Sequence, residues 1–235
     1  GEGTFAGNCP SVLFDPQLTK AAKESAEEKE TFMYKQMIWY DIGKKNGTMY
    51  IERMKGLVQN YSDASGIDCD KEKPMLNGTF RSTFCRFHKE FAMGDTGCNP
   101  FDANSTLGYE TRRPCFMLRV NKILGYFPPS AIVKKGESCN NTIAFQCRVE
   151  GNDNVTFSSG TISICSFPYW KQEGYQQPFV MVRPVNPLPE GTLKVICKVE
   201  SPLCHLDDEN DSRMSEWTHV HVMGDGKEEQ STTTS

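Results

Sequence analysis

The sequence lacks the features that would let it cross a membrane or bind nucleic acid. No run reaches about 18 consecutive apolar residues, the length that suggests a membrane-spanning helix, and the best strand-like apolar run is only Phe179–Val182. The chain begins at Gly1 with neither an initiator Met nor a signal-peptide pattern, so we expect an anchor or a leader to lie upstream of it. Its net charge of -4, with both signs interleaved, provides no basic face for phosphates.

Motifs of common catalytic and metal centres are also missing. There is no G-x-S-x-G elbow, H-E-x-x-H helix, P-loop or dinucleotide fingerprint. No cysteines form a C-x-x-C pair, which removes the main support for a zinc ribbon or a thioredoxin-like site. The sequence therefore predicts a protein that is not an enzyme and needs no cofactor.

Histidine is scarce, and the few present do not predict a metal site. The four are His88, His205, His219 and His221. His219 and His221 have the spacing that places two imidazoles on one face of a strand, as metal sites often use. Because no third ligand stands at a suitable spacing, we expect a solvent-facing strand with Thr218 and Val220 turned inward. The acidic residues 207–211 lack the spacing of an EF-hand and include a glycosylation sequon, so we expect a solvated loop there.

Cysteine and glycosylation sequons, by contrast, are abundant. The even number of cysteines predicts disulfides in an oxidising compartment: Cys9, Cys69, Cys85, Cys98, Cys115, Cys139, Cys147, Cys165, Cys197 and Cys204. Seven Asn-x-Ser/Thr sequons without Pro in the middle predict N-glycans on solvent-facing backbone: Asn46, Asn60, Asn77, Asn104, Asn140, Asn154 and Asn210. Together they indicate an extracellular glycoprotein.

Residue patterns divide the chain into a helical start and a β-rich remainder. A stretch rich in Ala, Glu, Lys and Gln predicts a surface helix from Asp15 to about Tyr40. A second helix is expected over 48–61, where one apolar stripe recurs at spacings of three and four: Tyr50, Met54, Leu57, Val58 and Tyr61. Short β-prone runs separated by turn residues follow at 79–87, 115–126, 142–149, 161–166, 178–183, 191–199 and 216–223.

We expect a mainly β fold, an immunoglobulin-like antiparallel β-sandwich with one or two helices on its side and disulfide staples. The separation of Cys147 and Cys197, with Trp170 between them, looks immunoglobulin-like. The predicted domains are a partly helical, membrane-proximal segment 1–62, a β domain 63–223 and a loose tail 224–235.

The stretch Phe167–Pro178 is dense in aromatic residues, Pro and Gln and contains no long aliphatic residue. Two interpretations stay open. It is either an aromatic loop packed on its own sandwich or a contact surface, since exposed Tyr and Trp offer large, rigid contact area.

The run Gly108–Pro128 closely resembles the extracellular signature of the β subunits of Na,K- and H,K-transporting P-type ATPases. It carries Gly-Tyr, then Pro-Cys, a β-run with a basic residue, Asn, a basic residue, two aliphatics, Gly, an aromatic residue and Pro, without a gap. We call this run the signature run. The resemblance extends over about residues 46–223 and implies disulfides Cys69–Cys85, Cys98–Cys115 and Cys147–Cys197.

The resemblance also implies a function. Members of the family are type II, single-span membrane glycoproteins whose outer domain binds a catalytic α subunit, helps it to reach the plasma membrane and modulates potassium and sodium transport. The implied contact residues on the extracellular side are Phe167, Pro168, Tyr169, Trp170, Tyr175, Gln177 and Pro178, which fit the aromatic-Pro-aromatic-aromatic core and the downstream Tyr-x-Gln-Pro of the family.

Some features depart from the family pattern. The Gly-Lys ending of the aromatic motif is missing, the segment 15–40 looks like an insertion, and Cys9, Cys139, Cys165 and Cys204 have no counterpart. For these four we expect Cys165–Cys204 and Cys9–Cys139, one of three possible pairings. The alternative function is a pump-independent adhesion or ligand glycoprotein of the same fold, with homotypic contact between cells as a further option.

Overall fold

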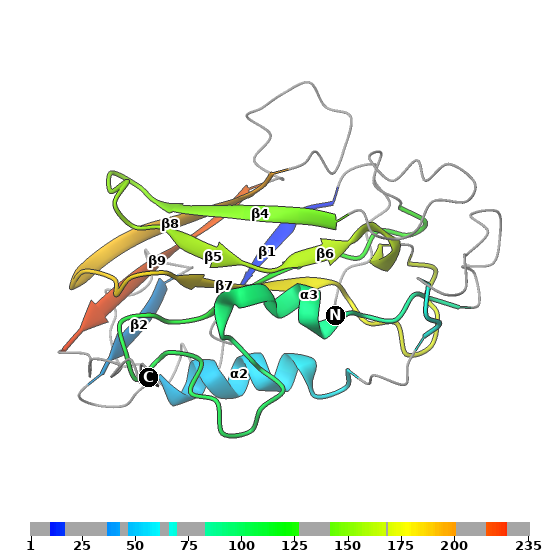
Figure 1. Cartoon of the computed structure of the whole chain (residues 1–235), viewed down its shortest axis with the longest axis horizontal. Helices are drawn as coiled ribbons and strands as arrows, with labels where there is room; N and C mark the ends of the chain where they lie inside the picture. The colour runs from blue at the N-terminus through cyan, green and yellow to red at the C-terminus, as the bar shows by residue number, and fades with distance from the viewer. Residues whose placement is uncertain are drawn as a thin grey trace, which may run out of the picture.

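Two packed β-sheets form the body of the protein in this computed structural model, which describes residues 10–16, 37–42, 47–61, 66–69, 83–126, 142–167, 169–200 and 215–224 (Figure 1). The four-stranded sheet has the order β1 (Val12–Asp15), β3 (Phe116–Val120), β7 (Phe179–Pro184) and β5 (Phe157–Ser159). The five-stranded sheet has the order β2 (Met37–Asp41), β9 (Ser215–Met223), β8 (Gly191–Val199), β4 (Thr142–Val149) and β6 (Thr161–Ser163). Neighbouring strands are antiparallel except β2 and β9, which are parallel. The predicted mainly β sandwich is confirmed.

Helices cover one side of this sandwich. They are α2 (Thr48–Val58) and α3 (Lys89–Met93), the latter followed by a 3-10 turn, Gly94–Thr96; both helices lie on the same side in Figure 1. Phe179 of β7 packs on this side, with its ring centroid 4.7 Å from that of Phe87 and 5.5 Å from that of Tyr61. Because both faces of the four-stranded sheet are covered, β3 and β7 are nearly continuous runs of buried residues.

The five-stranded sheet instead alternates between buried and exposed residues. In β4, Phe145, Cys147 and Val149 are buried, whereas Gln146 and Arg148 between them are exposed. From Thr218 on, strand β9 alternates between buried and half-buried residues, and Thr218 and Val220 face inward as the sequence predicted. Alternation of this kind is expected when one face of a sheet packs on the core and the other faces solvent.

The predicted helix over 48–61 is confirmed as α2, which ends at Val58. Its stripe residues Tyr50, Met54 and Val58 are buried, and Leu57 packs against the core. Tyr61 lies just beyond the helix, and its ring continues the same apolar contact.

The helix predicted from Asp15 to Tyr40 is wrong at both ends. Asp15 is the last residue of β1, and Met37–Asp41 form β2. Ile38 is only 1% exposed. Pairing with β3 and β9 therefore outweighs helix propensity at these positions. Residues 17–36 lie outside the described part of the chain. Both strands come from the predicted membrane-proximal segment, and both join sheets formed with later residues.

The other predicted strands agree to different extents. Strands β4 and β8 have the predicted bounds, while β7 and β9 differ by one residue at one or both ends. The described part of 79–87 is not a strand; only a single bridge joins Cys85 to Ile67. The run 115–126 is a strand only as far as Val120, and 161–166 gives way after Ser163 to a 3-10 turn, Ile164–Ser166. Strand β5 and helix α3 were not predicted.

The expected immunoglobulin-like use of Cys147 and Cys197 is also corrected. The two residues face each other directly on neighbouring strands β4 and β8, with a Cα–Cα distance of 4.1 Å, so their disulfide staples one sheet. In immunoglobulin domains the corresponding disulfide joins the two sheets and a buried Trp packs against it. Here Trp170 is 37% exposed.

Candidate partner-binding surface

Residues 167–178, which we call the aromatic loop, connect the 3-10 turn Ile164–Ser166 to β7. The hydroxyl of Tyr175 closes the base of the loop by donating to the carbonyl of Ser166 at 2.7 Å. The Tyr175 ring lies 4.9 Å from that of Tyr169 and 5.9 Å from that of Phe84. Burial raises the pKa of Tyr175 far above its usual range, so its phenol stays protonated and remains a hydrogen-bond donor.

Two parts of the chain outside the loop hold it in place: the signature run, through Gly125, and the segment that contains Thr83. The backbone N–H of Gly125 donates to the carbonyl of Tyr169 at 2.8 Å. The side chain of Gln172 is buried and bonds in two directions. Its Oε1 accepts from the N–H of Trp170 at 2.7 Å, and its Nε2 donates to the carbonyl of Thr83 at 3.1 Å. The loop conformation is therefore fixed by contacts distant in sequence.

An exposed apolar surface results at the tip of this arrangement. Trp170 is 37% exposed and Leu124 is 44% exposed. Gly125 lies beneath the indole: a Cβ at this position would stand 2.6 Å from Trp170 Cη2 and 2.7 Å from Cζ2. Lys122 Nζ lies 5.6 Å from the centroid of the half-buried Tyr169 ring, within reach of a cation–π contact. We call Leu124, Gly125, Tyr169 and Trp170 the Trp170 patch.

The structure places the seven predicted contact residues in different environments. Trp170 is exposed and Tyr169 half-buried, while Pro168 lies outside the described residues. Phe167, Gln177 and Pro178 are buried beneath the surface, and Tyr175 is half-buried with its phenol bonded inward, so these four hold the shape of the surface. Sequence reasoning missed Leu124 and Gly125 as surface residues. Their place in the signature run could have pointed to them, but that part of the run was predicted to be a strand.

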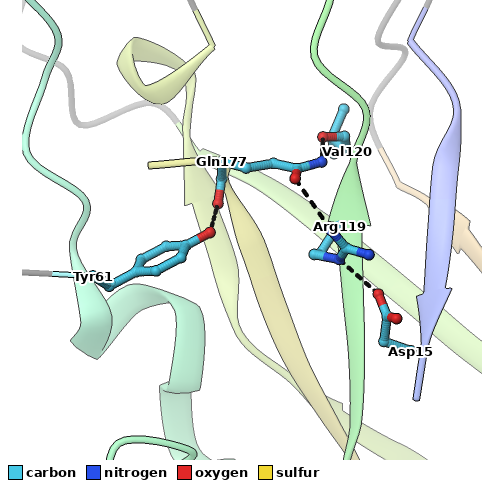
Figure 2. Close-up of polar contacts among 5 residues, drawn as sticks. All are labelled: Asp15, Tyr61, Arg119, Val120 and Gln177. Carbon is cyan, nitrogen blue, oxygen red and sulfur yellow. Dashed lines mark hydrogen bonds and ion pairs between the residues drawn. The ribbon is translucent and has the colours of Figure 1, made fainter. Parts of the chain in front are cut away.

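A polar network supports the loop where it enters β7 (Figure 2). Arg119 of β3 donates from Nε to Asp15 Oδ2 at 2.6 Å and from Nη1 to Gln177 Oε1 at 3.2 Å. Gln177 Nε2 donates to the carbonyl of Val120 at 2.7 Å. The hydroxyl of Tyr61 donates to the backbone carbonyl of Gln177. Gln177 therefore contacts both a sandwich strand and the segment that follows α2.

Comparisons with known proteins show the family of this chain. The family model described as "Sodium / potassium ATPase beta chain" matches residues 14–219. The chain belongs to this family.

Individual relatives are distant and longer than the chain. It is 25% identical over 198 residues to "Sodium/potassium-transporting ATPase subunit beta-2" of Rhinella marina, covering 73% of this chain and 64% of that protein. It is 27% identical over 135 residues to the Homo sapiens protein of the same name, covering 54% and 43%. It is 25% identical over 164 residues to "Potassium-transporting ATPase subunit beta" of Homo sapiens, covering 63% and 53%. The chain thus spans less than two thirds of the length of these relatives.

Three disulfides of this family member lie within the described residues. They join Cys69 to Cys85, Cys98 to Cys115 and Cys147 to Cys197, the pairs that the resemblance implied. Cys165 is also disulfide-bonded, to a partner outside the described residues. The pairings Cys165–Cys204 and Cys9–Cys139 stay predictions.

Three of the predicted glycosylation sites can be placed. Asn60, Asn104 and Asn154 are all exposed, at the end of α2 and in two turns. The other four sequons lie outside the described residues, and glycosylation of all seven stays a prediction.

The described residues show neither a metal centre nor a membrane span. Within those ranges no three His, Cys, Asp or Glu side chains gather closely enough to hold a metal ion. Among the helices of the same part of the chain, none is long and apolar enough to cross a bilayer. The acidic residues 207–211, expected to form a solvated loop, fall outside the described ranges.

Proposed function

We propose that this chain is the extracellular part of an accessory β subunit that binds the catalytic α subunit of a P-type cation-transporting ATPase. In this role it stabilises the α subunit at the plasma membrane and modulates potassium and sodium transport. The phosphoryl chemistry takes place on the α subunit, and this chain is not an enzyme. A membrane segment upstream of residue 1 anchors it.

The observation that carries this proposal is the Trp170 patch. Large apolar side chains on a surface commonly mark protein contacts, and Trp is enriched among residues that dominate binding energy. Such a contact is strongest when the side chain is already held in its bound position, because less conformational entropy is lost on binding. The hydrogen bonds of Gln172 and Gly125 fix the loop that carries Trp170 in this way.

Family membership supplies the kind of partner. The relatives are named as subunits of ion-transporting ATPases, and the match covers most of the β-sandwich. The Phe-Pro-Tyr-Trp core of the aromatic loop resembles the aromatic-Pro-aromatic-aromatic motif through which members of the family contact the α subunit. The buried Phe167, Gln177 and Pro178 support this surface from beneath and need not contact the partner themselves.

The test is recovery of an α subunit with variants of the full-length, membrane-anchored protein. Each variant is co-expressed with the α subunit of a Na,K- or H,K-transporting ATPase and isolated through a tag on the β subunit. We expect Trp170→Ala to reduce recovery of the α subunit by more than tenfold, since removal of a central Trp commonly costs about 2 kcal/mol or more.

Trp217 provides a matched control. It is 42% exposed, but on β9 of the five-stranded sheet, where its ring packs against His219 and Lys194. Trp217→Ala should leave recovery unchanged. The proposal is wrong if the unaltered protein recovers no α subunit, or if the two Trp substitutions have equal effects.

A further inference from the structure

Arg119 divides one guanidinium group between two acceptors. Its Nε contacts Asp15 on the neighbouring strand β1, and its Nη1 contacts Gln177 at the C-terminal end of the aromatic loop (Figure 2). The side chains of Asp15 and Arg119 are 2% and 14% exposed, so water competes little for either bond. A planar guanidinium can serve two acceptors in fixed directions, which an ammonium group cannot do.

Stability alone is a weak explanation for this arrangement. Buried ion pairs often contribute no more than well-packed apolar residues of similar volume, because both charges lose their hydration. What the pair adds is a defined geometry. Asp15 holds the guanidinium, and the guanidinium in turn holds the amide of Gln177.

Gln177 is restrained at every polar group that the structure describes for its side chain and carbonyl. Oε1 accepts from Arg119, Nε2 donates to the carbonyl of Val120, and the backbone carbonyl accepts from Tyr61. Two residues earlier, Tyr175 packs its ring against Tyr169, next to Trp170. A short path therefore runs from Arg119 to Gln177 by a hydrogen bond, along the backbone to Tyr175, and by ring contact to Tyr169 of the Trp170 patch.

We propose that Arg119 is a positioning residue for the partner contact: by holding Gln177 against β3, it fixes the direction in which the aromatic loop presents Trp170. The effect on partner binding rests on the proposed function, whereas the effect on Trp170 itself does not. Asp15 takes part because it orients Arg119.

Two substitutions break this path at different points. Gln177→Met keeps a side chain of similar length, removes both amide hydrogen bonds and leaves the ion pair of Asp15 with Arg119 intact. Arg119→Lys keeps the charge but cannot serve both acceptors in the same geometry. The matched control is Glu150→Gln, which removes the exposed ion pair to Lys194, at 2.8 Å, on the five-stranded sheet.

Three measurements separate positioning from simple stability. Urea unfolding reports stability. Acrylamide quenching, in a background with Trp39→Phe and Trp217→Phe, reports the exposure of Trp170 as the only remaining tryptophan of the three. Recovery of the α subunit with the full-length protein reports binding.

We expect both Gln177→Met and Arg119→Lys to increase quenching of Trp170 while the protein is fully folded. We also expect them to lower recovery of the α subunit about tenfold, the effect of losing roughly one hydrogen bond to a charged group. Glu150→Gln should change neither readout.

The inference is overturned if a folded variant of the two shows reduced unfolding stability but unchanged quenching of Trp170. Arg119 would then have only a structural role. Increased quenching supports the inference even if Trp170→Ala leaves recovery of the α subunit intact. That last result would refute the proposed function and leave the positioning role standing.

Discussion

Gly125→Ala perturbs the Trp170 patch without removing any of its side chains. Gly125 has φ of +67°, a left-handed conformation that costs an L-residue roughly 1 to 2 kcal/mol. The added methyl would also stand 2.6 Å from Trp170 Cη2, closer than carbon atoms approach in folded proteins. Because the indole is partly exposed, the ring can turn away, at a further cost of about 1 kcal/mol for an unfavourable rotamer. The expected loss of unfolding free energy is about 2 to 3 kcal/mol.

Gly151→Ala isolates the backbone part of this cost. Gly151 has φ of +73°, and no atom lies within 4 Å of the position that a Cβ would take. This substitution should therefore destabilise the protein by only the backbone cost, about 1 to 2 kcal/mol. It should leave recovery of the α subunit unchanged, whereas Gly125→Ala should reduce it because Trp170 is displaced.

A double-mutant cycle then tests the contact itself. In a Trp170→Ala background the ring is absent, so Gly125→Ala should cost about 1 kcal/mol less than in the unaltered protein. Urea unfolding of the four proteins gives this coupling energy. A coupling energy near zero would refute the contact between Gly125 and the indole. Normal recovery of the α subunit by Gly125→Ala would refute the role of the patch in binding.

Two further predictions concern the sandwich. Replacing Cys147 and Cys197 by Ala opens a loop of 50 residues, whereas replacing Cys69 and Cys85 opens one of 16. Chain entropy predicts that the free energy of unfolding, measured in urea, falls by about 4 kcal/mol for the first pair and about 3 kcal/mol for the second. A clear reversal of this order would contradict the prediction. Burial lowers the pKa of His219; the charge of Lys194 lowers it further and that of Glu150 opposes the shift. The unfolded chain therefore protonates this imidazole more readily than the folded protein does, and the free energy of unfolding should fall as pH drops through about 6.5. Urea midpoints at about pH 7.5 and pH 5.5 should therefore differ more for the unaltered protein than for His219→Gln. An equal difference in the two proteins would contradict the lowered pKa of His219.

Patterns of local residue spacing predicted the elements that depend on one buried face. The stripe of Tyr50, Met54 and Val58 identified α2, and alternation identified β4, β8 and β9 nearly to the residue. In these elements the hydrophobic period alone decides which side chains enter the core.

Elements whose conformation depends on distant partners were missed. Strand β2 exists because β9 offers a parallel edge to Ile38 and its neighbours, and no local pattern near residue 37 shows that edge. The same limit applies to the predicted contact residues. Composition found the aromatic loop, but only the fold shows that Gln177 is buried, at 8% exposure, while Trp170 is exposed.

The signature run identified the family through residues that build the frame of the proposed contact surface more than that surface itself. Cys115 anchors β3 through the disulfide to Cys98, and Arg119 holds Asp15 and Gln177. Asn121 fixes the start of β1, since its Oδ1 accepts from the N–H of Ser11 at 2.6 Å and its own N–H donates to the carbonyl of Ser11 at 3.0 Å. Gly125 leaves room for the indole. Such a frame can present different aromatic side chains without being rebuilt, which explains how a loop without the Gly-Lys ending of the family motif can still fit beside an intact signature run.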